Sequence, residues 1–394
     1  MKHILVLHPV AEYTLSRMLD ACERRGWKLS IATIDSSTVG GDGTRLHRWL
    51  RVPELNDEPA DLLRSVEGLH FDAVVAGNEF AVIAADVLAK ELGLVGNDPE
   101  RIKASRDKRL MREVFAQAGV PQPIVIGTVS SLDEAYALDW SRVVFPVIVK
   151  PVNMAMSLFV RLCRSQEEVT ENLVRMFNFK KSRLTNYLFT ASAIIEEFAD
   201  GQEYSLECVV EDGAVVALYP TKKFVSELPS CFEIGHVNSV PFNPDQSVAL
   251  NQIANGVASS WGLASGIMHV ELKVCGTTIK VIEAGCRIAG CHISELVEGR
   301  YGVSLEEVLL SHRLGLSARS LIGAPPSEDY FGIRFYFPQS QRLHPAGDAL
   351  KEVAFHYSPD QPTSGDPFSV NQRLGHCIVA SPDHADICEF IGAA

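Results

Sequence analysis

The first 105 residues alternate short apolar runs with segments of helical periodicity. The pattern predicts strands at HILVLHP, KLSIATID and FDAVVAGNE, and helices at EYTLSRMLDACERRG and FAVIAADVLAKELG. We expect the first helix to stop at Gly26, because glycine readily adopts the left-handed conformation that ends helices. This β-α-β rhythm predicts a parallel sheet covered by helices.

Two polar residues follow the third predicted strand. Asn78 and Glu79 come at its carboxyl end, where open α/β sheets bind ligands. Capping of the following helix is an equally good interpretation, and the sequence leaves both open.

A basic segment follows. SRDKRLMREVFAQAGVPQP predicts a helix from near Ser105 to Gly119, with Arg106, Lys108 and Arg109 in its first turn. Positive charge at a helix start is unfavourable for the helix dipole. We therefore expect at least one of these cations to face an anion, the alternative being a solvated basic face.

The remaining chain alternates strands, turns and helices. Lys150 interrupts the apolar strand FPVIVKPV, and a buried lysine is costly unless it is paired. Helical periodicity predicts a helix from Ser165 to about Asn178 and another at VSLEEVLLSHRLGL. Two hairpins are expected to turn at Asp212-Gly213 and near Gly276-Thr277. From about residue 325 short strands, including FGIRFYFP and LGHCIVASP, form a C-terminal unit.

The second hairpin carries two acids. Strand alternation places His269, Glu271 and Lys273 on one face, and the turn brings Glu283 roughly opposite Glu271. Adjacent carboxylates repel each other, and a divalent cation removes that conflict. Since Mg²⁺ prefers carboxylates, phosphate oxygens and water, the pair favours a magnesium–nucleotide site. The alternative is a cross-strand pair separated by water or by lysine side chains.

Composition narrows the class of protein. The 394 residues carry a net charge of −13, which argues against nucleic-acid or membrane binding as the main role. No apolar stretch is long enough to span a membrane, and MKHILVLHPV is interpreted as a strand because a signal peptide needs a longer apolar segment. Nine scattered cysteines without a CxxC pair favour reduced thiols and a cytoplasmic location.

Six segments in order resemble the ATP-grasp superfamily, in its carboxylate–amine ligase branch, and in particular ligases that join amino acids into dipeptides. They are SRDKRLMREVFAQAGVPQP, FPVIVKPVNMAMSLFVRL, IIEEFADGQEYSLE, FEIGHVNSVPF, GIMHVELKV and VIEAGCR. The resemblance implies an α/β ATP-grasp fold with an N-terminal parallel domain at 1–105, a nucleotide-binding region at 106–316 and a C-terminal α+β subdomain at 317–394. The lid would cover roughly 122–196.

The resemblance also implies ligands and roles. It implies ATP with Mg²⁺, Mn²⁺ being an alternative metal, and small-molecule acid and amine substrates; dimers are common in relatives. The implied ATP-binding residues are Lys108, Lys150, Ser157, Glu196, Glu197, Ala199 and Glu203. Either Lys222 or Lys223 would reach the transferred phosphate, and Lys223 is the candidate carried forward. Glu271 and Glu283 would bridge the metal, and Arg287 would stabilise developing negative charge.

Substrate residues are implied in two places. FEIGHVNSVP resembles the substrate loop of dipeptide-forming ligases, where Glu233 would hold an ammonium group and His236 would orient a carboxylate or act on the amine proton. A hydrogen-bonded structural histidine is the alternative for His236. Cys291 and Ser294 would lie near the acyl site, where a small Cys291 leaves room for a larger acid.

Two departures from the pattern stand out. The lid turn, glycine-rich in many relatives, is NMAMS here, so it must avoid positive φ or place Asn153 there. Many relatives have Asn two residues after the second metal acid, where this chain has Gly285.

The expected function is an ATP-dependent ligase that forms an amide between a small carboxylic acid and an amino acid, with peptide or peptide-antibiotic formation as its setting. Two alternatives remain: a carboxylase-type enzyme that activates bicarbonate or formate, and a non-catalytic nucleotide-binding scaffold.

Overall fold

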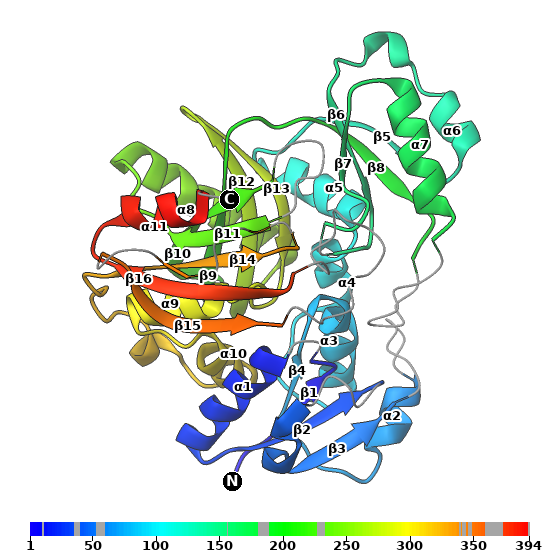
Figure 1. Cartoon of the computed structure of the whole chain (residues 1–394). Coiled ribbons are helices and arrows are strands. Elements are labelled where there is room, and N and C mark those ends of the chain that lie inside the picture. Colours follow the sequence, from blue (N-terminus) through cyan, green and yellow to red (C-terminus); the bar gives the residue numbers. More distant parts are fainter. Residues whose placement is uncertain are drawn as a thin grey trace.

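A computed structural model describes most of the chain (Figure 1). The described residues are 1–9, 12–34, 40–52, 60–155, 157–179, 189–226, 233–338, 340, 344–345, 349–358 and 373–392.

The N-terminal residues form a parallel sheet in the order β3-β2-β1-β4. Its strands are β1 His3–Leu7, β2 Lys28–Thr33, β3 Arg48–Arg51 and β4 Ala73–Ala76. The accompanying helices are α1 Glu12–Arg25, α2 Ala60–Val66, α3 Val82–Glu91 and α4 Pro99–Ile102, with 3-10 turns η2 Gly40–Arg45, η3 Glu79–Ala81 and η4 Lys103–Ser105. The predicted parallel sheet is confirmed, and α1 stops before Gly26, whose φ is +65°. The sequence patterns gave no sign of β3 or α2.

A second, antiparallel sheet belongs to a unit that projects at the upper right of Figure 1. Its order is β5-β8-β6-β7, with β5 Val125–Val129, β6 Val147–Pro151, β7 Arg161–Cys163 and β8 Ala193–Glu197. Helices α6 Leu132–Tyr136 and α7 Gln166–Phe177 and the turn η5 Trp140–Arg142 complete this unit, which we call the lid. Ser165 caps α7 at its start, as the sequence predicts.

The largest sheet is antiparallel and has the order β13-β12-β9-β10-β11-β14-β16-β15. Its strands are β9 Gln202–Glu211, β10 Ala214–Val225, β11 Glu233–Asn238, β12 Gly266–Cys275, β13 Thr278–Gly285, β14 Tyr330–Tyr336, β15 Lys351–Tyr357 and β16 Gly375–Ser381. The helices beside it are α5 Lys108–Ala118, α8 Pro244–Trp261, α9 Ile293–Tyr301, α10 Leu305–Arg313 and α11 His384–Gly392, with the turn η6 Arg319–Leu321. Both predicted hairpin turns are confirmed.

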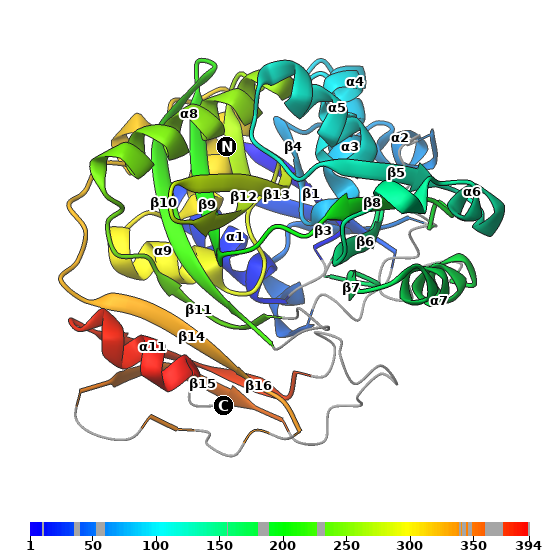
Figure 2. The same cartoon turned by 90° about the horizontal axis from the view of Figure 1, so that it is seen from above.

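Two expectations for this sheet need correction. Glu233 to Asn238, expected in a substrate loop, form the strand β11, which pairs with β10 and β14. The C-terminal strands β14, β16 and β15 continue the same sheet, as the view from above shows (Figure 2). The domain boundaries given above stay a prediction.

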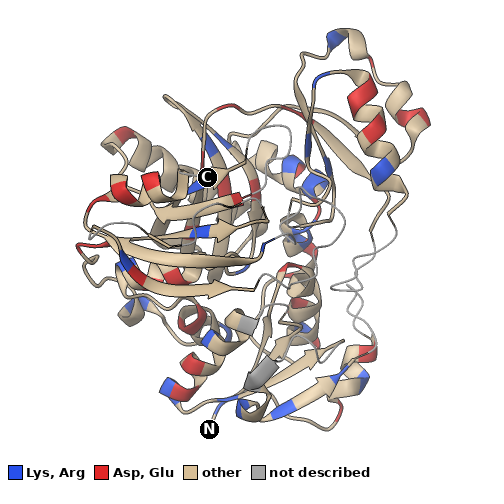
Figure 3. Cartoon of the chain, viewed as in Figure 1, with Lys and Arg blue, Asp and Glu red and all other residues tan. Residues whose placement is uncertain are grey.

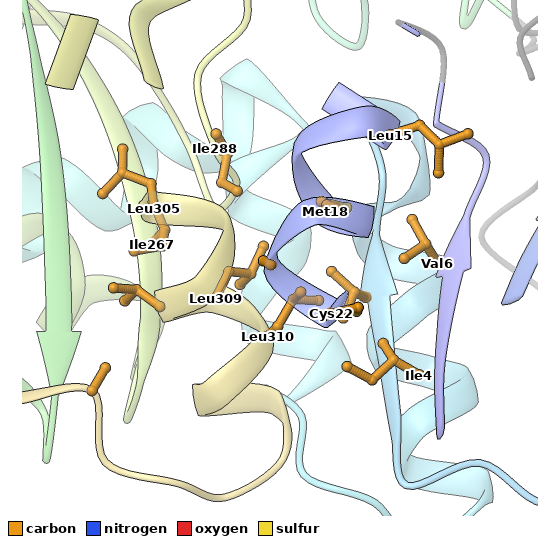
Figure 4. Packing of buried hydrophobic residues seen from close by; sticks show 14 of the residues in the cluster. Ile4, Val6, Leu15, Met18, Cys22, Ile267, Ile288, Leu305, Leu309 and Leu310 are labelled. Atoms are coloured by element: carbon orange, nitrogen blue, oxygen red, sulfur yellow. The ribbon is translucent and has the colours of Figure 1, made fainter. Parts of the chain in front are cut away.

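Two apolar clusters hold these layers together. On one side of the large sheet, α5 and α8 pack over Leu206, Val270 and Val281. On the other side α9 and α10 lie between the sheet and α1, so that Met18 and Cys22 of α1 join Leu309 and Leu310 of α10 in one cluster (Figure 4). This second cluster fixes the N-terminal unit against the large sheet.

Within the described residues, no helix is long and apolar enough to cross a membrane.

Truncating this contact should destabilise the protein. Leu310→Ala removes a side chain with 0% exposure between α1 and α10 and should cost about 2–5 kcal/mol of unfolding free energy, because a cavity forms. Leu316→Ala, at a position 45% exposed, is the matched control and should change it by less than about 0.5 kcal/mol. Urea unfolding of the two variants checks this, and equal losses would contradict the packing role.

Candidate active site

A single cavity of about 950 Å³ lies between the lid, the large sheet and the N-terminal sheet. Twelve of the fifteen predicted site residues line it: Lys108, Lys150, Ser157, Glu196, Glu197, Ala199, Glu203, Glu233, Glu271, Glu283, Arg287 and Cys291. The other three, Lys223, His236 and Ser294, are buried behind the wall, with exposures of 1%, 0% and 1%. Distant segments therefore converge on one site, although Ser294 does not face it.

The two predicted metal acids are cross-strand neighbours. Glu271 of β12 pairs in register with Glu283 of β13, and a bulge follows Glu271. Lysines separate the carboxylates: Lys223 Nζ lies 2.6 Å from Glu271, and Lys108 Nζ lies 2.8 Å from Glu283. Figure 3 shows acidic and basic positions close together on β12, β13 and α5. The pairing expected from the hairpin is confirmed.

The start of α5 explains its basic first turn. Arg106 Nη1 lies 2.6 Å from Glu79, Lys108 contacts Glu283, and Arg109 lies 3.0 Å from the capping residue Asp107. The expectation that these cations face anions is confirmed. Asn78 accepts a hydrogen bond from the Phe80 amide as the cap of η3, and both Asn78 and Glu79 line the cavity. Capping is therefore confirmed for Asn78, and ligand binding at this strand end stays a prediction.

Lys150 and Glu196 form a buried ion pair under the lid. Lys150 Nζ lies 2.8 Å from Glu196 Oε2 and donates to the Ile282 carbonyl at 3.0 Å. Arg112 of α5 binds the other Glu196 oxygen at 2.6 Å. Burial alone would raise the pKa of Glu196, but the charges of Lys150 and Arg112 outweigh it and hold the pKa at about 2. Burial also disfavours the charged form of Lys150, and for a lysine this lowers the pKa.

Lys223 binds three carboxylates at once. Its ammonium lies 2.6 Å from Glu233, 2.6 Å from Glu271 and 3.1 Å from Glu203. Burial opposes its charge, but the three acids raise its pKa well above the usual value. Lys222, on the opposite face of β10, lies over the Phe224 ring at 5.0 Å. Of the two candidates, Lys223 is therefore the one directed toward the site, although acids shield it from the cavity.

His236 and Cys291 lie near Glu233. His236 Nε2 is 3.5 Å from Glu233 Oε2, and burial lowers the His236 pKa. Ligand atoms of Glu233, His236 and Cys291 all lie within 4.8 Å of one another, a spacing that could hold a metal ion. However, Lys223 and Arg373 already bind Glu233, and Arg373 donates to the Cys291 sulfur at 3.0 Å. A cation there would meet two fixed positive charges, and so would a cation at Glu271 and Glu283, which bind Lys223 and Lys108. The positive charges therefore do not distinguish the two sets, and Glu271 and Glu283 stay the predicted metal ligands.

The far end of the cavity is lined by aromatic and imidazole rings. Tyr13 stacks on His292 with ring centroids 4.1 Å apart, and His292 lies 4.2 Å from His376. Burial and the neighbouring His292 lower the pKa of His376 to about 4. This end joins α1 of the N-terminal unit to β16 of the large sheet.

The lid turn departs from expectation. Positive φ occurs at Ser157 (54°) and Phe159 (59°) and not at Asn153. The sequence predicted that this turn either avoids positive φ or has it at Asn153, and both alternatives are wrong, because Ser157 has positive φ. Asn153 instead donates a hydrogen bond to the Thr190 hydroxyl at 2.9 Å and steadies the base of the lid.

Comparison with known proteins agrees with this arrangement. Residues 143–295 match the family described as the ATP-grasp domain. The alanine–anticapsin ligase of Bacillus amyloliquefaciens is 25% identical over 267 residues, which are 64% of this chain and 55% of that protein. Over its full length, the chain superposes on the L-amino acid ligase from Bacillus licheniformis with a TM-score of 0.79 and 19% identity, covering 99% of this chain and 96% of that one.

The chain contains an ATP-grasp domain at residues 143–295.

The likeness is distant, and it extends to several enzymes of this fold. Human carnosine synthase 1 is 23% identical over 62% of this chain and 31% of its own length. Phosphoribosylglycinamide synthetase from Anaerococcus prevotii has the same fold, with a TM-score of 0.72 and 17% identity, covering 100% of this chain and 97% of that one. The chain spans about half the length of the alanine–anticapsin ligases it matches. Fold and superfamily therefore follow from the comparisons, but substrates do not.

The donor set of this ATP-grasp protein fits ATP and a divalent metal. Lys108 and Lys150 bring two buried cations to one cavity, which suits a polyphosphate. Glu271 and Glu283 offer adjacent carboxylate oxygens, the ligands that Mg²⁺ prefers. Glu197 and Ala199 line the same cavity, and Glu203 follows on β9.

Three contributors escaped the sequence analysis. Arg112 follows Lys108 by four positions, so helical spacing could have placed both on one face. Glu207 binds His269 at 2.6 Å, and alternation along β9 marks it as a neighbour of Ser205 and Glu203. Arg373 has no local signal, because its contacts to Glu233 and Cys291 depend on long-range pairing of β16.

Neutralising Glu196 should remove stability that depends on pH. Because its folded pKa is about 2, below its ordinary value of 4.5, its contribution is present above pH 4.5 and is lost as pH falls toward 2. Glu196→Gln should reduce the unfolding free energy by roughly 3 kcal/mol near pH 7 and by progressively less below pH 4.5. Urea unfolding at several pH values measures this, with the exposed Glu100→Gln as the control. A difference that does not shrink in acid would contradict the ion-pair assignment.

Proposed function

We propose that the chain is an ATP-dependent ligase that joins a small carboxylic acid or an amino acid to the amino group of an amino acid. The observation that supports this most is that Arg287, Glu271 and Glu283 line one cavity together with Lys108 and Lys150. A scaffold that only binds nucleotide has no need of all these charges. Relatives such as alanine–anticapsin ligase and L-amino acid ligase favour peptide or peptide-antibiotic formation as the setting.

The proposed reaction has two steps. A substrate carboxylate attacks the γ-phosphorus of ATP, an acyl phosphate forms and ADP leaves. The amine of the second substrate then attacks the acyl carbon, the C–N bond forms, phosphate leaves and the amine loses a proton. Both steps develop negative charge, so fixed cations and amide donors supply most of the catalysis.

Each charged group has a proposed part in these steps. Lys108 and Lys150 hold the nucleotide phosphates, and Arg287 stabilises the oxyanion on the acyl side. Mg²⁺ held by Glu271 and Glu283 would neutralise phosphate charge. Lys223 acts through the acids it binds, because three carboxylates surround its ammonium.

The amine site is proposed near Glu233. Its carboxylate lines the cavity, but Lys223 and Arg373 already bind it, so it would accept a hydrogen bond from the uncharged attacking amine rather than hold an ammonium group. His236 lies behind it at 3.5 Å, so His236 would act by orienting Glu233. Cys291, a small residue on the same wall, leaves room for an acid with a side chain, which favours an organic acid over bicarbonate.

Turnover with defined substrate pairs tests the proposal. The protein should release ADP and phosphate from Mg-ATP only when an acid and an amino acid are both supplied, and a matching amide should appear by mass spectrometry. Release that depends on bicarbonate would instead indicate a carboxylase. If no pair of an acid and an amino acid stimulates release of ADP and phosphate, the ligase proposal fails and a nucleotide-binding scaffold is the remaining interpretation.

Removing the catalytic arginine separates binding from chemistry. Arg287→Ala should lower amide formation by roughly 10²- to 10³-fold, because the oxyanion loses its fixed cation, while ATP still binds. Titration with a fluorescent nucleotide checks binding. Arg319→Ala, at a side chain 57% exposed, is the matched control. Full activity of Arg287→Ala would contradict the assigned role.

A further inference from the structure

Three charged side chains form a row at the edge of the cavity. Glu79, which follows β4 of the N-terminal sheet, accepts a hydrogen bond from Arg287 Nε through one oxygen. Through the other oxygen it binds Arg106 Nη1 at 2.6 Å. Glu79 and Arg106 are only 7% and 4% exposed. The row therefore joins the proposed catalytic arginine to a separate unit of the fold.

Gly285 provides the space that this row requires. A Cβ at residue 285 would lie 3.1 Å from Glu79 Oε2 and 3.6 Å from Arg287 Nε. A separation of 3.1 Å is tighter than nine in ten real Cβ contacts, so a larger side chain would require the Glu79 carboxylate to shift by a few tenths of an ångström. Gly285, which departs from the ATP-grasp pattern, thus leaves space for the side chain of Glu79, about two hundred residues earlier in the chain.

The row leaves Arg287 with its charge. Two arginines and one glutamate carry a net charge of +1, so Glu79 does not neutralise the site as an isolated Glu–Arg pair would. Arg287 Nε points to Glu79, and Nη1 donates to the Ile288 carbonyl at 3.0 Å. Among the described residues Nη2 has no hydrogen-bond partner. Two of the three nitrogens are therefore anchored, and the guanidinium plane is fixed with Nη2 free for a ligand.

Arg106 extends the row to the lid. Its Nη2 donates to the Asn153 carbonyl at 3.0 Å, and Asn153 follows β6. Its guanidinium also lies over the Phe80 ring at 4.9 Å. The acid that orients Arg287 is consequently itself held by a residue that touches the base of the lid.

We propose that Glu79 is a positioning residue that fixes Arg287 for the acyl-transfer reaction, and that Gly285 is the space that lets it do so. This inference rests on the proposed ligase function. Glu79 acts on the reaction through the Arg287 guanidinium, which makes it distinct from an ion pair that only stabilises the fold.

The chain contains a matched structural pair for comparison. Asp86 of α3 is 0% exposed and binds Arg313 and Asn97, away from the cavity lining. Asp86→Asn therefore removes a buried acid from an arginine in the same part of the fold, without touching Arg287. It controls for loss of stability.

The test compares these variants with one substrate pair that the wild-type protein joins. Glu79→Gln should lower kcat by roughly 10- to 100-fold, because a small misplacement of a catalytic group is enough for such a loss. The KM for ATP should stay within about twofold of wild type. Asp86→Asn should lower stability and leave kcat unchanged. Gly285→Ala should give a smaller kcat loss than Glu79→Gln.

A double-mutant cycle shows whether Glu79 acts through Arg287. Lysine lacks the guanidinium Nε–H that contacts Glu79, so Arg287→Lys already removes this contact. Adding Glu79→Gln to Arg287→Lys should therefore cause little further loss of kcat. If Glu79→Gln fails to fold because Arg106 loses its carboxylate partner, Glu79→Gln with Arg106→Met removes that cation and should show the same kcat loss. An unchanged kcat in a folded variant, or an equal loss in both backgrounds, would overturn the proposal.

A spectroscopic readout separates this inference from the ligase proposal. With arginine-selective ¹⁵N labelling, the Arg287 Nε–H signal, assigned with Arg287→Lys, should exchange slowly with water in the wild type and rapidly in Glu79→Gln. Slow exchange in both would refute the positioning contact whatever the activity. An inactive wild type that still shows the difference would refute the ligase function and leave the contact itself established.

Discussion

Lys223 is the charge on which the rest of the site depends. Among the acids that line the cavity, Glu203, Glu233 and Glu271 all reach this one ammonium. Without it, neighbouring carboxylates on β9, β11 and β12 would repel one another and take up protons. Burying Lys223 is unfavourable by itself, and its three partners make the arrangement stable. The strand order β12-β9-β10-β11 is what brings these side chains to one place.

Other cations in the cavity are paired in the same way. Lys108 binds Glu283, Lys150 binds Glu196, and Arg287 binds Glu79. When a polyphosphate and a metal bind, the phosphates would replace the carboxylates as partners of the cations, and the metal would take up the released carboxylates. These protein charges are already removed from water, so binding would require little further desolvation. Because the cations are held by strands and by α5, their positions are set before any ligand arrives, which is the condition for electrostatic catalysis.

The sequence could predict features that follow from local rules. The period of two and the turn at Gly276-Thr277 were enough to pair Glu271 with Glu283. Lys108 and Lys150 stood out because a cation at a helix start or in an apolar strand needs a partner. Exposed β15 lacks a clear apolar alternation, so no pattern marked it. Strand β11 was mistaken for a loop, although β10 ends shortly before it at Val225; its other partner, β14, lies almost a hundred residues further along the chain.

Gly285 shows why a departure from a family pattern has to be judged in three dimensions. Along the chain, a glycine in place of asparagine looks like the loss of a metal ligand and supports a scaffold. In space, a Cβ at that position would lie 3.1 Å from Glu79 Oε2, so a larger side chain would press on this carboxylate. A protein that had lost its chemistry would have no reason to keep a net positive row of Arg106, Glu79 and Arg287 beside an acid pair. The glycine therefore favours the proposed ligase over a silent scaffold, because the absence of a side chain at residue 285 leaves space for the contact between Glu79 and Arg287.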